Sequence, residues 1–108
     1  MPSIVVTANT VAQTAFTAPS TRIITLKRID IDHHGVNAVE LTFRDTFTPS
    51  ISNAVAVPVA TTENKLVVSA VPGTHVEITD GVSGLRFLGL CSVLSTVIDA
   101  DCDVTVIW

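Results

Sequence analysis

The chain has 108 residues, with six basic and ten acidic side chains and a formal net charge of -4. This length is enough for one hydrophobic core and predicts a single domain. Hydrophobic residues make up 47% of the chain and charged residues 15%, which excludes intrinsic disorder and a coiled coil. No apolar run approaches the roughly 20 residues that a membrane-spanning helix needs, so we expect no membrane partner.

Valine, threonine and isoleucine together account for 41 of the 108 residues. Such β-branched side chains disfavour helix and suit a pleated, half-buried surface. Turn signals such as Pro72-Gly73 and Asp80-Gly81 recur at short intervals and separate strands of ordinary length. The pattern predicts an all-β, single-domain, antiparallel β-sandwich that is either jelly-roll-like or immunoglobulin-like.

The first 17 residues alternate only weakly between apolar and polar side chains. Residues 1–17 are therefore interpreted either as an arm that reaches a neighbouring subunit or as the first strand of the sandwich. The remaining residues, 18–108, form the predicted sandwich domain. The N-terminus has no basic segment followed by a long apolar one, so we expect no secretory signal and synthesis in the cytoplasm.

Along residues 21–32 the alternation changes phase, because Ile24 and Leu26 have one parity and Ile29 and Ile31 the other. A β-bulge near Lys27-Arg28 would reconcile the two parities. The tripeptide His33-His34-Gly35 then predicts a hairpin turn into the strand 36–47, with Gly35 at positive φ.

Later segments predict further strands with one buried face. Val39, Leu41 and Phe43 share one face of their strand, and Val104, Val106 and Trp108 do so at the C-terminus. Pro58 interrupts the apolar run 55–59, which predicts an edge or bulged strand there. The stretch 85–97 is more apolar than a strand with one solvated face requires, so something is expected to cover its second face.

One group of side chains has the chemistry of a weak metal site. Asp30, Asp32, His33 and His34 offer carboxylates and imidazoles close together in the sequence, as divalent transition metals prefer. The competing interpretation is a solvated hairpin tip, and it is favoured. His75 is too distant along the chain for its proximity to be assumed.

Two other groups contain side chains that can bind calcium or act as nucleophiles. Asp99, Asp101 and Asp103 resemble the start of a calcium loop, but the glycine and closing glutamate of an EF-hand are missing, which leaves a weak surface site or an acidic turn. Cys91 and Cys102 are expected to be reduced thiols in a core, without the electropositive surroundings of a nucleophile. The alternative is a single disulfide between them, if their strands pair.

The sequence lacks the common motifs of nucleotide-binding, hydrolytic and zinc-dependent enzymes, so we predict no catalytic residues, no cofactor and no enzymatic activity. The net negative charge and the few aromatic residues argue against a nucleic-acid partner. Side chains of the N-terminal segment and of the apolar stretch 85–97 are the predicted subunit or partner contacts: Ile4, Val6, Leu85, Arg86, Leu88 and Leu90. Arg86 is either an interface anchor or an ordinary arginine with a buried stem.

The segments 21–32 and 39–45 together resemble small β-sandwich proteins of tailed-phage virions. Residues 63–70 and 72–78 are similar to their middle strands, and residues 103–108 to their closing strand, so the likeness covers residues 14–108. Such proteins decorate capsids or form head fibres, commonly as trimers.

The resemblance implies a structural virion protein made in the host cytoplasm. It would bind the major capsid protein on the outside of the head, stabilise the shell and form a homotrimer. The alternatives from the sequence are a module that binds carbohydrate or a host surface, a tail or baseplate component, and a small metal enzyme at residues 30–34. Few aromatic side chains are present to form a sugar-binding platform.

Overall fold

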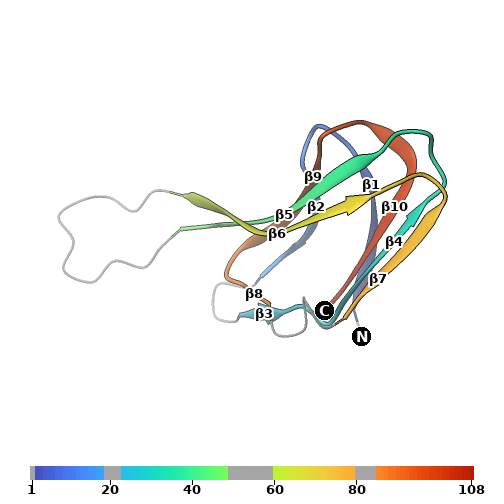
Figure 1. The fold of residues 1–108 in the computed structure, drawn as a ribbon. Coiled ribbons are helices and arrows are strands. Elements are labelled where there is room, and N and C mark those ends of the chain that lie inside the picture. The colour runs from blue at the N-terminus through green and yellow to red at the C-terminus, as the bar shows by residue number, and fades with distance from the viewer. Residues whose placement is uncertain (1, 19–22, 49–59, 80–84) are drawn as a thin grey trace, which may run out of the picture.

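A computed structural model describes residues 2–18, 23–48, 60–79 and 85–108. These residues form strands and no helix, and two four-stranded antiparallel sheets pack against each other in a single domain, which confirms the predicted β-sandwich (Figure 1). The strands are β1 (Ser3–Ala8), β2 (Gln13–Thr17), β3 (Ile24–Thr25), β4 (Arg28–His33), β5 (Val39–Phe47), β6 (Thr61–Ala70), β7 (Thr74–Ile78), β8 (Arg86–Phe87), β9 (Leu90–Ser95) and β10 (Asp99–Ile107).

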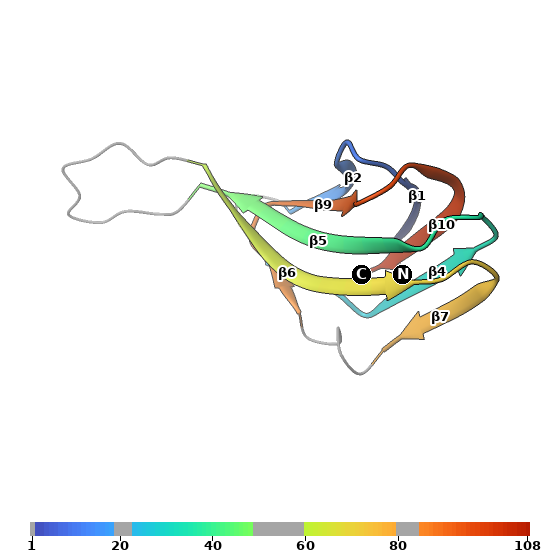
Figure 2. The same ribbon diagram turned by 45° about the horizontal axis from the view of Figure 1, so that its top comes forward.

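The first sheet, sheet A, has the strand order β1-β10-β4-β7. The second, sheet B, has the order β2-β9-β5-β6, and the short strands β3 and β8 pair with each other. Figure 2 shows β5 and β6 in one layer and β4 and β7 in the other. The chain therefore changes layer at each of the connections β1–β2, β4–β5, β6–β7 and β9–β10.

The pairings are nested: β5 pairs with β6, β4 with β7, β3 with β8, β2 with β9 and β1 with β10. The chain thus forms one long antiparallel ribbon that rolls up until β10 meets β4 and β9 meets β5. Two four-stranded sheets in this order are a jelly roll. The topology decides between the two predicted types of sandwich.

Inward-facing side chains of both sheets form the core. Leu41 and Phe43 of β5 and Val104 of β10 are fully buried, whereas Glu40 between two buried neighbours is exposed, as the alternation predicted. The Phe16 ring packs 4.6 Å from that of Trp108 and 5.5 Å from that of Phe87, measured between centroids. Burial of these side chains is the main favourable term in folding.

The predicted bulge at Lys27-Arg28 is wrong, because the chain changes sheet there instead. The N–H of Leu26 donates to the Leu85 carbonyl beside β8, and the N–H of the next residue, Lys27, donates to the Ile107 carbonyl at the end of β10 (both 2.9 Å). Ile24, Leu26, Ile29 and Ile31 are all buried. The phase slip in the sequence therefore marks the passage from the β3–β8 pair into sheet A.

The predicted hairpin at His33-His34-Gly35 is also wrong. The chain does turn after His33, but β4 lies in sheet A and β5 in sheet B, so the two strands are not hydrogen-bonded neighbours. Residues 3–8 and 13–17 form β1 and β2, which are edge strands of sheets A and B. The predicted strand at 55–59 with Pro58 lies outside the described residues.

The apolar stretch 85–97 is divided into β8 and β9 by a bend, which a buried carboxylate holds. Asp45 on β5 is fully buried, and its two oxygens accept hydrogen bonds from the N–H groups of Leu88 (2.9 Å) and Gly89 (3.0 Å). A side chain on Gly89 would overlap the carbonyl of Thr46.

We expect Asp45→Ala to lower the free energy of unfolding by about 1–3 kcal/mol, because it removes the acceptor of the two N–H groups at this bend. Chemical denaturation followed by circular dichroism measures the change. Glu40→Ala, an exposed acidic position on the same strand, is the matched control and should change stability by less than about 0.5 kcal/mol. Equal effects of the two substitutions would contradict this role for Asp45.

Candidate functional site

The four weak candidates for a metal site, Asp30, Asp32, His33 and His34, do not form one site. Asp30 and Asp32 of β4 face outward from sheet A, while His33 of the same strand faces inward and is 1% exposed. His34 follows the strand and is exposed, with its Nε2 2.9 Å from Asp32 Oδ2. The predicted set is wrong in including His33, because successive side chains of a strand point to opposite faces.

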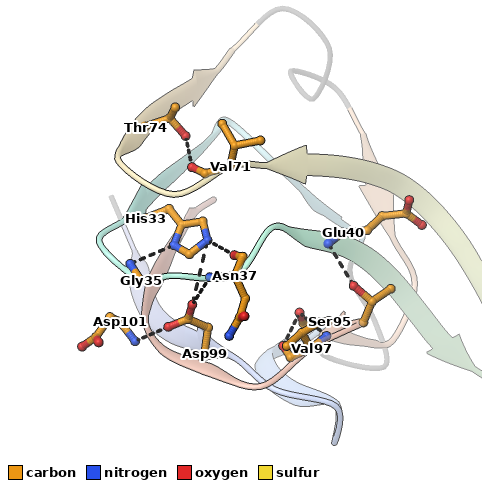
Figure 3. Close-up of polar contacts among 11 residues, drawn as sticks. His33, Gly35, Asn37, Glu40, Val71, Thr74, Ser95, Val97, Asp99 and Asp101 are labelled. Carbon is orange, nitrogen blue, oxygen red and sulfur yellow. Dashed lines mark hydrogen bonds and ion pairs between the residues drawn. The ribbon is translucent and has the colours of Figure 1, made fainter.

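His33 fastens the connection between the two sheets. Its Nδ1 accepts a hydrogen bond from the N–H of Gly35 (3.1 Å), and its Nε2 donates to the carbonyl of Asn37 (Figure 3). This pair of contacts requires the neutral ring with its proton on Nε2. The His33 side chain is therefore fully used in holding residues 35–37 and is not free to bind a ligand.

Asp99, the first residue of β10, holds the same connection from the opposite side. Its Oδ2 accepts from the N–H of Asn37 (3.4 Å) and its Oδ1 from that of Asp101 (3.1 Å). The predicted positive φ at Gly35 is wrong, since Gly73 is the glycine with that conformation among the described residues. Gly35 is required for another reason: a Cβ there would overlap the Asp99 carboxylate.

We expect Gly35→Ala to destabilise the fold by about 1–3 kcal/mol, because the added methyl group forces Asp99 away from its backbone partners. Thermal and urea denaturation of the purified chain give the change. In an Asp99→Ala background the same substitution should cost much less, since the group that it collides with is gone. A cost that is equal in both backgrounds would contradict the contact.

Strand pairing brings two other residues to Asp30 and Asp32. In the antiparallel register of β4 and β7, Asp30 lies opposite Glu77 and Asp32 opposite His75. Ligand atoms of Asp30, His75 and Glu77 lie within 4.8 Å of one another, so among the described residues these three could hold a cation. His75 is far from Asp30 along the chain, but the pairing of β4 with β7 brings the two residues close together in space.

The carboxylates of this group already have a basic partner. Arg28 Nε donates to Asp30 Oδ1 (2.8 Å), and its Nη2 lies 3.3 Å from Glu77 Oε2. The hydrogen bond to Asp30 raises the pKa of Arg28 above its usual value, so the guanidinium stays charged. The arrangement is a cross-strand ion-pair network on the outer face of sheet A, in which a cation would compete with Arg28.

The candidate calcium ligands are separated. Asp99 is buried and bonded to backbone N–H groups, whereas Asp101 is exposed and Asp103 faces outward beside Asp32. Asp99 also belongs to β10 rather than to the predicted turn. The three aspartates therefore do not converge on one point.

Both cysteines are free and buried, Cys91 in sheet B and Cys102 in sheet A. Burial, together with the charge of the nearby Asp45, raises the pKa of the Cys91 thiol to about 12. Burial, with the charges of Asp99, Asp103 and Asp32, raises the pKa of Cys102 to about 11. These shifts keep both thiols neutral and poorly nucleophilic.

Both thiols have a higher pKa in the folded chain than the ordinary value of 9.0. Their contribution to the stability of the folded state is therefore fully present below pH 9 and is lost as the pH rises through the folded-state pKa. We expect the free energy of unfolding to fall between about pH 9 and 11, by up to about 1.4 kcal/mol per pH unit for each thiol. Urea titrations across this range measure the slope, undisturbed by tyrosine, which the chain lacks. The double variant Cys91→Ala, Cys102→Ala should flatten it; an unchanged slope would contradict the assignment.

The predicted contact residues fall in different environments. Val6 and Leu85 are half-buried and pack against the core, Ile4 is 36% exposed on the inner side of β1, and Arg86 is exposed on β8. Leu88 is 47% exposed at the bend before β9. Leu90 is half-buried and faces outward from sheet B beside Thr46.

The two outer faces of the sandwich differ in chemistry, which only the strand register reveals. Across sheet A, outward positions of β4, β7 and β10 carry Asp30, Asp32, Asp103 and Glu77, with Arg28 and His75 among them, whereas the outward residues of β1 are uncharged. Across sheet B, they carry mainly hydroxyl and aliphatic side chains: Leu90, Ser92, Leu94, Thr42, Thr46, Val67, Ser69, Thr62 and Asn64. Glu40 and Arg44 are the charged members of the second set. One face is therefore acidic and the other almost neutral.

Comparison with protein-family models, with curated protein sequences and with solved structures found no match to this chain. Within the described residues there is no helix of the length and hydrophobicity needed to cross a membrane.

Proposed function

We propose that this chain is a structural virion protein that binds the outer surface of a phage head through the outer face of sheet B. The observation that carries the proposal is the difference between the two outer faces. Interface centres are depleted of charged residues, because desolvating an unpaired charge is costly. The face built around Leu90, Leu94 and Val67 meets this requirement, and the acidic face of sheet A does not.

The position of Arg44 agrees with such a role. It lies on the outer face of sheet B between Ser92 and Asn64, where the neighbouring side chains are uncharged. Arginine is enriched among the residues that dominate binding energies, since its planar group combines packing with several hydrogen bonds. The proposed docking surface thus has aliphatic contacts around one basic anchor.

The fold and the nature of the polar clusters support a structural role over a catalytic one. Jelly rolls are found in viral capsid and lectin domains, although a fold alone does not define a function. The buried polar side chains Asp45, His33 and Asp99 all bond to backbone groups where the chain leaves its strands. They stabilise the corners of the sandwich.

The direct test is whether the chain is part of a particle. Lysate of the cells that carry its gene is fractionated on a density gradient, and the chain is detected by mass spectrometry. We expect it in the fractions that contain DNA-filled heads, retained after a wash. Recovery only among free proteins would overturn the proposal.

Binding of the purified chain to such particles, stripped of it beforehand, tests the surface. We expect Leu94→Asp to weaken binding by about tenfold or more, equivalent to at least about 1.4 kcal/mol, because it places a charge in the neutral face. Val36→Asp, at an 86% exposed position between β4 and β5, is the matched control and should bind normally. Circular dichroism checks that both variants fold, and equal binding by both would contradict the assigned surface.

A further inference from the structure

The four edges of the two sheets are not equally protected against pairing with another strand. Unpaired edges attract further strands, and proteins protect them with charges, bulges and short strands. On β6, Lys65 is the extra residue of a bulge and lies next to Glu63. β7 has five residues and presents His75 and Glu77, while β2 has an irregularity between Thr14 and Phe16.

The fourth edge, β1, is less protected, because it is uncharged and its register irregularity lies only at its end, between Thr7 and Ala8. Its sequence Ser-Ile-Val-Val-Thr-Ala has no charged residue, and it follows β10 in continuous register from Ser3 to Thr7. Val5 is 58% exposed on its outer side and Ile4 is 36% exposed on its inner side. β1 is therefore an uncharged, regular edge with apolar side chains on both faces.

The backbone groups on the free side of β1 can be assigned from one hydrogen bond. The N–H of Trp108 donates to the Pro2 carbonyl (3.0 Å), in the same register as the rest of the β1–β10 ladder. Antiparallel ladders alternate, so Ile4 and Val6 also direct their backbone groups toward β10. The N–H and C=O groups of Ser3, Val5 and Thr7 consequently point away from the sheet.

We infer that β1 pairs with β1 of a second copy of this chain, antiparallel and about a two-fold axis at Val5. In this register Val5 lies opposite Val5, and Ser3 lies opposite Thr7 of the other copy. All three are residues whose backbone groups point outward, so each donor meets an acceptor. Ile4 lies opposite Val6 of the other copy on the inner side. Because β1 has no charged side chain, the pairing places no two like charges of β1 opposite each other.

The self-complementary register is what selects a second copy over a foreign strand. A two-fold axis requires one segment to match its own reverse, and residues 3–7 do so in both hydrogen bonding and side-chain character. The resulting dimer joins the two A sheets into one continuous sheet. It differs from the trimer that the resemblance to virion proteins implies.

The pairing also bears on the proposed function, although it does not depend on it. An axis perpendicular to the joined sheet keeps the acidic faces of both copies on one side. The two outer faces of sheet B then lie on the opposite side and can bind a shell together, which increases the apparent affinity without new contacts.

Light scattering coupled to size exclusion tests the inference on the full chain across a dilution series. We expect a mass of twice 11.4 kDa for the natural sequence. Val5→Lys and Val5→Pro should give monomers, because the first puts two like charges at the axis and the second removes an outward N–H without breaking the β1–β10 ladder. Val71→Lys, at a similarly exposed (54%) position between β6 and β7, should remain dimeric.

Hydrogen exchange adds an independent readout. The Val5 amide should be protected from exchange both in the natural dimer and in Val71→Lys, and rapid exchange of this amide in either would contradict the inference. A monomer at all concentrations, a trimer, or a dimer that survives both Val5 substitutions would each overturn it. Circular dichroism excludes unfolding of the variants. Failure of particle binding with an intact dimer would contradict the proposed function alone.

Discussion

The structure depends on the nesting of its antiparallel pairs around the connection between β5 and β6. Each strand of the first half finds its partner in the second half, and the rolled ribbon then brings β10 against β4 and β9 against β5. Because every backbone group needs a partner when buried, this order fixes the sheet in which each segment lies. It also fixes which side chains face the core and which face outward.

Three buried polar side chains, Asp45, His33 and Asp99, bind backbone groups at the corners of the roll. Asp45 bonds to the bend between β8 and β9, and His33 and Asp99 together fasten the residues between β4 and β5. Where the chain leaves a ladder, its N–H groups lose strand partners, and these side chains replace them. The buried ionisable residues are thus explained by the change of sheet at each corner.

The outer faces and edges receive different chemistry from the same register. Ion pairs around Arg28 make the outer face of sheet A charged and hydrated, while hydroxyl and aliphatic side chains keep that of sheet B nearly neutral. Pairing through β1 would present two such neutral faces on one side of a dimer. The proposed binding surface and the proposed subunit contact are therefore separate parts of the molecule that act in the same direction.

The fold class follows from the amino-acid sequence alone, because β-branched composition and alternation of period two, as in Val39, Leu41 and Phe43, are local properties. The sequence also located the change in phase between Leu26 and Ile29, but not its cause. Tertiary structure alone decided the jelly-roll order, the burial of Asp45, the separation of His33 from Asp30, and the meeting of Asp32 with His75. These depend on pairing between strands far apart in the chain, and alternation specifies a buried face without specifying which strand lies beside it.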